Sequence, residues 1–315
     1  MQLYRPRGFN DFFQDTFTFL KNNGLHFFKH YFIINGIFLL ILLTISYFFG
    51  KFYTDFVLGS VLNPNSSEVL IDGYFNENFG LFILLLFVFF IVAITAGVIS
   101  YAYTPIYFKL YLQNNGRHFE TKEIINSYKT NLGRIFIFLI CALLIAIPTV
   151  IGVGITSFIL TITIIGILFL PFLMGLVLLF FGMTLMEYIE GKRGVWDSFG
   201  YSWSLLSSKF WPAIGAMGLF ILMSYIIQFV INIFSSFFNT VNILTGIENG
   251  GFNSDEASNS SIVIALLLFV MSFLISTLLG NIIQIAQGVI FYGLKELREN
   301  IGTKDIIDQI GNSEN

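Results

Sequence analysis

The sequence has 315 residues, of which 56% are hydrophobic and only 11% are charged, and its formal net charge is −3. Soluble domains carry about 25% charged residues, so this composition, with a mean hydropathy of +0.79, excludes an ordinary soluble protein. It predicts an all-α polytopic membrane protein, and we expect membrane lipids rather than nucleic acid as its partners.

Six uncharged apolar runs are long enough to cross a bilayer, which needs about 20 residues of helix. The six predicted spans are residues 32–49, 81–103, 135–153, 156–186, 212–234 and 262–291. We expect Pro171 to kink the fourth span and Pro212 to lie in the first turn of the fifth, where a missing N–H has no cost.

The third and fourth spans come from one interval of 52 residues without a charge, between Arg134 and Glu187. This interval is about twice as long as a bilayer requires, so we divide it into two crossings. Gly152 and Gly154 are expected to form the tight turn between them.

The basic residues indicate the orientation, because Lys and Arg are retained on the cytoplasmic side of a membrane. All of the 16 Lys and Arg residues except Lys51 fall in alternate segments between the spans. Both termini are therefore predicted to be cytoplasmic, with outer loops at 50–80 and 236–261.

Aromatic segments at 9–28, 120–136 and 194–211 precede the first, third and fifth spans. Each has one aromatic face flanked by basic residues, which is typical of an amphipathic helix lying in the membrane interface. We therefore predict three interfacial helices. The candidate lipid contacts are Phe12, Phe13, Tyr128, Trp196, Trp203, Lys209 and Trp211.

The same segments suggest an internal repeat within a single membrane domain, residues 1–315. Thr18-Phe19, Ser127-Tyr128 and Ser202-Trp203 align, as do Phe27, Phe136 and Trp211. The predicted repeat units are 9–103, 118–186 and 194–292, followed by a cytoplasmic tail at 293–315. The alternative is that any amphipathic helix leading into a span produces such matches.

Polar amides are the most hydrophilic side chains inside the predicted spans. The candidates are Asn35, Gln228, Asn232, Asn281, Gln284 and Gln287. They could join helices by hydrogen bonds, with Gly280 and Gly288 allowing close approach of the fifth and sixth spans, or they could line a substrate site. The absence of charged residues within the spans argues against a proton-coupled transporter.

Glu187 and Glu190 follow the fourth span directly and are succeeded by Lys192 and Arg193. We expect a solvated loop that anchors the end of the helix. The alternative is a functional charge pair.

The segment from Glu187 to Trp211 resembles proteins related to the membrane domain of glycerophosphoryl diester phosphodiesterases. An acidic residue leaves a span, a Gly-containing loop follows, and an amphipathic helix ending in Lys-Phe-Trp leads into the next span. The tail from Phe291 to Gly302 is similar to the C-termini of bacterial members. The resemblance implies a six-span protein of a bacterial inner membrane, without an assigned activity.

The sequence departs from the enzyme that gives this group its name. A metal-dependent phosphodiesterase needs clustered carboxylates and usually paired histidines, whereas His26, His30 and His118 have no acidic cluster beside them. A catalytic barrel of about 250 residues has no room in this chain. Cys141 has no partner for a disulfide. We expect no catalytic residue, no cofactor and no metal site.

Three functions are compatible with these features. The first is a membrane-organising or accessory protein that engages lipid through aromatic interfacial helices, with a protein partner or a second copy as its possible associate. The second is a lipid or small-solute transporter. The third is a non-catalytic subunit of an enzyme acting on phospholipid headgroups.

Overall fold

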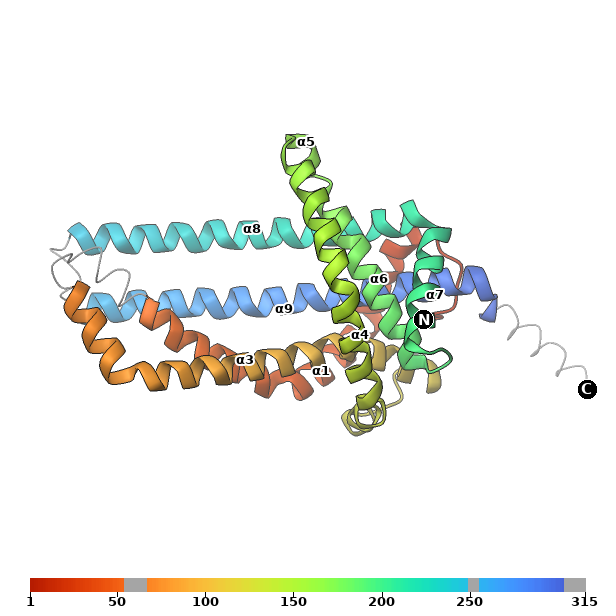
Figure 1. Ribbon diagram of the computed structural model, residues 1–315, viewed down its shortest axis with the longest axis horizontal. Helices are drawn as coiled ribbons and strands as arrows, with labels where there is room; N and C mark the ends of the chain where they lie inside the picture. Colours follow the sequence, from red (N-terminus) through yellow and green to blue (C-terminus); the bar gives the residue numbers. More distant parts are fainter. Residues whose placement is uncertain (54–66, 249–254, 303–315) are drawn as a thin grey trace, which may run out of the picture. The chain divides into compact units, whose positions relative to one another are not determined.

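The computed structural model describes residues 1–53, 67–248 and 255–302, and all of the regular structure in these residues is helical (Figure 1). Six of the described helical segments are long and apolar enough to cross a membrane: 9–49, 80–113, 121–161, 165–190, 210–238 and 267–299. The chain is therefore an all-α, multi-pass membrane protein, as the sequence predicts.

The helices divide between two compact units. The helices are α1 (Phe9–Tyr53), α3 (Ser67–Gln113), α4 (Thr121–Thr161), α5 (Ile164–Ile167), α6 (Leu170–Glu190), α7 (Val195–Ser208), α8 (Phe210–Glu248) and α9 (Asp255–Glu299). Unit 1 consists of residues 1–28 and 102–315, and unit 2 of residues 29–101. Helices α1 and α3 both continue from one unit into the other.

The helices are longer than the predicted spans. Helix α9 has 45 residues, and at 1.5 Å per residue a helix of that size is about 67 Å long, whereas the hydrocarbon layer is about 30 Å thick. Helix α3 begins at Ser67 and α8 ends at Glu248. Much of the two predicted outer loops is therefore helical, and their remaining parts, 54–66 and 249–254, lie outside the described residues, as does 303–315 of the predicted tail.

The turn between the third and fourth spans lies further along the chain than predicted. Helix α4 continues through Gly152 and Gly154, and the chain turns around the short helix α5. The backbone N–H of Gly166 donates to Thr163 Oγ1 at 3.0 Å and stabilises this turn. Pro171 lies at the start of α6 and does not kink a helix. Glycine within a long apolar helix costs only about 1 kcal/mol, so two of them do not end it.

Two of the three predicted interfacial helices are not separate elements. Residues 9–28 and 121–136 continue into their spans as parts of α1 and α4, because no proline interrupts the junctions. Only α7 is separate. Lys209 has φ −139 and ψ 52 and breaks the helix, and Pro212 follows in the first turn of α8. The interfacial position of these segments stays a prediction.

The aromatic face at the start of α1 packs inside unit 1. Phe12, Phe19 and Phe27 are fully buried. The ring of Phe19 lies 5.0 Å from that of Phe108, and the ring of Phe27 lies 4.9 Å from that of Tyr107. Since Phe12 is buried, the prediction that it contacts lipid is wrong. The sequence could not distinguish the two environments, because a protein core and a bilayer favour the same aromatic side chains.

Small residues allow close contacts within unit 1, where α8 and α9 lie side by side and α6 packs on both (Figure 1). A Cβ added at Gly288 would lie 2.2 Å from Phe108 Cε2, so this glycine permits the approach of α3 to α9. A Cβ added at Gly280 would meet nothing within 4 Å. The close contact at Gly288 is thus with α3 and not with α8, the helix of the fifth span, and Gly280 makes no such contact.

Replacing Gly288 with alanine should therefore destabilise the protein. The added methyl group overlaps a buried ring, and overpacking of this kind costs about 1–3 kcal/mol. Gly280→Ala is the matched control on the same helix, and it should be neutral or slightly stabilising. Unfolding titrations with SDS in mixed micelles measure both. Equal effects of the two substitutions would contradict the packing described.

Candidate functional site at the C-terminal end of helix α6

Helix α6 ends at a glycine that other residues could not easily replace. Gly191 has φ +82, in the left-handed region, and its N–H donates to the carbonyl of Tyr188 at 3.1 Å. A Cβ at this position would lie 2.5 Å from Arg134 Nη1. Both the backbone conformation and the close guanidinium therefore require glycine, which directs the chain into the loop before α7.

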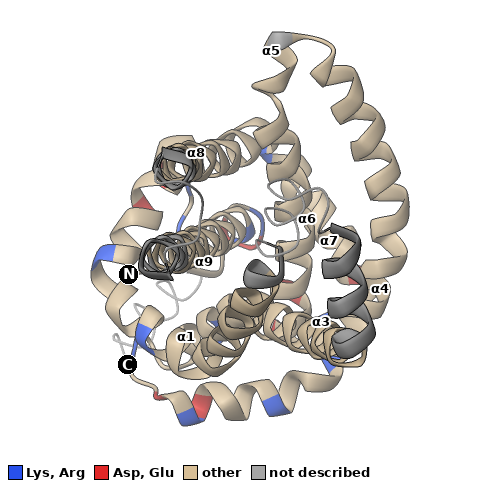
Figure 2. Cartoon of the chain, turned by 90° about the vertical axis from the view of Figure 1, so that its left-hand side faces the viewer, with Lys and Arg blue, Asp and Glu red and all other residues tan. Residues whose placement is uncertain are grey.

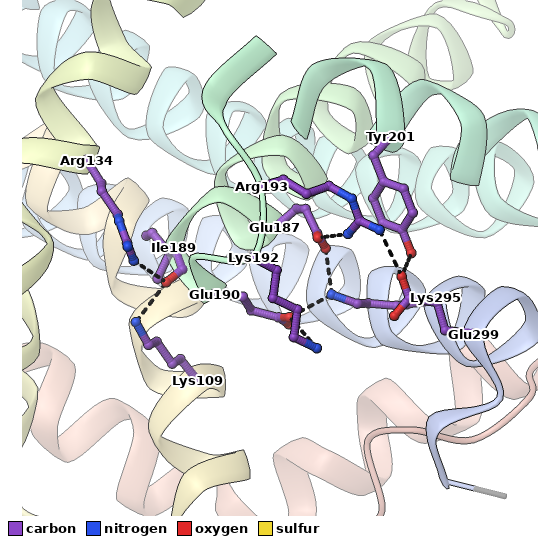
Figure 3. Close-up of polar contacts among 10 residues, drawn as sticks. All are labelled: Lys109, Arg134, Glu187, Ile189, Glu190, Lys192, Arg193, Tyr201, Lys295 and Glu299. Carbon is purple, nitrogen blue, oxygen red and sulfur yellow. Dashed lines mark hydrogen bonds and ion pairs between the residues drawn. The ribbon is translucent and has the colours of Figure 1, made fainter. Parts of the chain in front are cut away.

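A buried ionic cluster lies beside this turn (Figure 3). Lys295 Nζ on α9 donates to Glu187 Oε2 and to Glu190 Oε2, at 2.6 Å in each case. The side chains of Glu187 and Lys295 are fully buried. Charges removed from water in this way require opposite charges as partners. The prediction of a solvated loop is therefore wrong, and the two carboxylates belong to an internal charge network.

Arg193 extends the network to α7 and to the end of α9. Its guanidinium donates to Glu187 and, at 3.3 Å, to Glu299, and it stacks on the ring of Tyr201 at 3.7 Å. Burial alone would lower the pKa of Arg193, but Glu187 and Glu299 together raise it. Burial and a hydrogen bond donated to Glu299 raise the pKa of Tyr201. Arg193 therefore stays charged, and Tyr201 stays protonated.

The N-terminal segment packs against the same region. Arg7 is buried and donates to Asp15 at 2.6 Å and to the carbonyl of Leu3 at 2.5 Å. The rings of Tyr4 and Tyr292 meet edge to face at 5.3 Å. Burial, and next the nearby Glu190, raise the pKa of Tyr4 above its usual value. The first residues of the chain therefore contribute to the low-polarity surroundings of the cluster.

Two further cations converge on the last turn of α6. Lys109 Nζ on α3 donates to the carbonyl of Ile189 at 2.7 Å, and Arg134 Nη1 on α4 lies 3.5 Å from the same oxygen (Figure 3). Lys109 also donates to Asn131 at 3.3 Å. Cations at a helix C-terminus satisfy its last carbonyls and interact favourably with its dipole.

The predicted intramembrane amides do not form one site. Gln284 accepts a hydrogen bond from Thr104 at 2.9 Å, and Gln287 donates to the carbonyl of Leu178 at 3.2 Å. These two join α9 to α3 and α6. In unit 2, Asn35 accepts a hydrogen bond from Ser100 at 3.1 Å.

The remaining amides are bound within their own helices or face outward. Asn281 donates to the carbonyl of Thr277 at 2.8 Å, and Gln228 donates to Ser224 at 3.0 Å. Asn232 is exposed. The hydrogen bonds of Gln284 and Gln287 join neighbouring helices, which favours the interhelical role of these two amides over a substrate site.

The predicted lipid contacts on α7 and α8 are on the surface of unit 1. Trp196, Trp203 and Trp211 have exposed fractions of 57%, 52% and 79%, and Lys209 is exposed between the last two. We call these four residues the tryptophan surface. Phe13 and Tyr128, by contrast, are only partly exposed.

An adjoining face of α7 is buried and fixes the helix in place. Phe199 stacks on Phe138 of α4 at 5.9 Å, and Leu205 and Leu206 are fully buried. Arg298 of α9 donates to Ser204 of α7. The orientation of the tryptophan surface therefore follows from packing within unit 1.

Sequence reasoning missed Lys295 and Tyr201 as members of the cluster. Glu187 and Glu190 are three residues apart and share a helix face, which could have indicated a common partner. That partner lies 108 residues beyond Glu187, and no local pattern connects them.

Comparisons with known proteins identify no relative. No family model matches the chain, and neither the curated proteins nor the solved structures contain a match. Within the described part of the chain, no group of three or more His, Cys, Asp or Glu side chains is placed to hold a metal ion.

Substitution of Lys295 by methionine should strongly destabilise the protein. It leaves Glu190, whose side chain is only 9% exposed, without its principal partner, and such a loss costs about 3–5 kcal/mol. Lys192→Met is the matched control, because Lys192 is exposed and its ion pair with Glu190 is long, at 4.0 Å. Surface changes of this kind alter the free energy of unfolding by no more than about 0.5 kcal/mol. SDS titrations in mixed micelles compare the two. A Lys295→Met protein as stable as the control would contradict the importance of the cluster.

Proposed function

We propose that the protein is a membrane-organising protein that binds phospholipid at one leaflet through its tryptophan surface. The observation that carries this proposal is that all 3 tryptophans of the chain are exposed on α7 and the beginning of α8. Tryptophan prefers the membrane–water interface, where its ring contacts acyl chains and its N–H meets water. An integral protein that holds several such rings in fixed positions binds and orders the surrounding headgroups.

The rigidity of α7 supports this function. Trp196 and Trp203 project from a helix whose adjoining face is packed, so they need little ordering when they meet lipid. Lys209 adds a positive charge beside Trp211, which favours anionic headgroups. Binding through this surface requires no catalytic group, and it leaves the rest of the protein available for a partner protein or a second copy.

The distribution of basic residues supports a cytoplasmic position for this surface. Lys192, Arg193 and Lys209 flank α7, and cytoplasmic segments of membrane proteins are enriched in Lys and Arg. On this assignment both termini face the cytoplasm, and the membrane is the inner membrane of a bacterium. The relevant lipids are then the anionic phospholipids of its inner leaflet.

Tryptophan fluorescence tests the lipid contact directly, because the three tryptophans of this surface are the source of all tryptophan emission from the protein. In reconstituted vesicles, lipids brominated near the headgroup should quench the emission more strongly than lipids brominated deep in the acyl chain, and aqueous acrylamide should quench weakly. Strong quenching by acrylamide together with none by brominated lipid would refute the proposal.

Lipid retention tests the function itself. Changing Trp196, Trp203 and Trp211 together to alanine should reduce the phospholipid that copurifies with the detergent-extracted protein. The matched control changes Phe158, Phe169 and Phe229, which are equally exposed aromatic residues in the apolar segments. Mass spectrometry of the bound lipid compares the two variants. An equal loss in both would mean that the tryptophan surface has no special role.

Cysteine labelling tests the orientation. After Cys141 is replaced, a membrane-impermeant maleimide applied to intact cells should label Asp255→Cys, whereas Lys192→Cys should react only after permeabilisation. The reverse pattern would place the tryptophan surface outside the cell.

A further inference from the structure

We propose that Lys109 and Arg134 form an anion-binding site that takes a phosphate group at the C-terminal end of α6. The two side chains come from different helices, α3 and α4, and both lie within hydrogen-bonding distance of the carbonyl of Ile189 (Figure 3). The cationic groups are therefore held close together. The site differs from the tryptophan surface in every residue, so the inference goes beyond the proposed function.

The charges of the region are unevenly matched. Glu187 and Glu190 already pair with Lys295, and Arg193 pairs with Glu187 and Glu299. Among the described residues, neither Lys109 nor Arg134 has a carboxylate within ion-pair distance. Two like charges that converge on a neutral oxygen repel each other, and a bound anion would relieve that repulsion.

The available donors suit a phosphate. Arg134 contacts Ile189 through one terminal nitrogen only, which leaves the other side of its planar fork for two parallel hydrogen bonds to phosphate oxygens. Lys109 supplies a point charge beside it, positioned by Asn131. Both side chains are partly exposed, so an anion can reach them.

The position in the chain points to the level of lipid headgroups. Arg134 is the last charged residue before the 52-residue uncharged interval, and Lys109 lies near the end of α3. Phosphates of phospholipids occupy this boundary between hydrocarbon and water. The phosphate could belong to an anionic lipid or to a small soluble molecule, and the two sources share the same recognition chemistry.

The experiment uses the full chain and two probes. In detergent, inorganic phosphate is titrated against chloride at equal ionic strength while the melting temperature is recorded. In nanodiscs, native mass spectrometry measures the retention of phosphatidylglycerol against phosphatidylcholine. We expect Arg134→Gln with Lys109→Gln to weaken binding about tenfold or more, because two charge-assisted contacts are lost. Lys122→Gln, an exposed cation on α4, is the matched control and should bind normally.

A conservative variant separates binding from helix capping. Arg134→Lys keeps a cation near Ile189 but lacks the planar fork, so it should fold normally and still bind phosphate more weakly than the wild type. Selective retention of phosphatidylglycerol with no response to inorganic phosphate would identify a lipid ligand, and the opposite result a soluble one. Absence of both responses in the wild type, or unchanged binding in Arg134→Lys and in the double variant, would overturn the proposal. A wild-type response to inorganic phosphate in the triple tryptophan variant would show that the two sites act separately.

Discussion

The burial of Lys295 between two carboxylates is the constraint on which the arrangement of unit 1 depends. An ion removed from water is tolerated only where opposite charges and hydrogen bonds replace its hydration. Glu187, Glu190 and Lys295 meet this condition at 2.6 Å, and they can do so in only one register of α6 against α9. Apolar packing alone would allow many registers, because hydrophobic contacts have no direction.

The same constraint gives α7 its fixed orientation. Arg193 and Tyr201 connect α7 and the loop before it to the cluster, while Phe199 packs on the neighbouring helices. These contacts cover one face of α7, and Trp196 and Trp203 are exposed on the adjoining face. The acidic groups of the cluster pair with Lys295 and Arg193, and none of them forms an ion pair with Lys109 or Arg134. The ionic cluster thus leaves two distinct surfaces free to bind a ligand: the aromatic tryptophan surface, and the cationic pair Lys109 and Arg134.

Sequence reasoning predicted the helical class and the six crossings, because a bilayer imposes a length and composition that local sequence must meet. It could not place Phe12, since aromatic residues suit both a lipid interface and a protein core. It misplaced the turn at Gly152 and Gly154, because context decides whether glycine ends a helix. Lys295 counts among the basic residues that indicate the orientation, but the sequence could not identify it as the partner of Glu187, since their pairing depends on how distant helices pack.

The separation of the charged partners also affects biosynthesis. Glu187 precedes Lys295 by 108 residues, and at about 5–20 residues per second the ribosome needs about 5–20 s to synthesise that interval. During this time the two carboxylates at the end of α6 have not met the cation that α9 supplies. Final packing of unit 1 must therefore wait for the last membrane helix. A chain that stops before Lys295 lacks the cation that pairs with Glu187 and Glu190 in the completed protein.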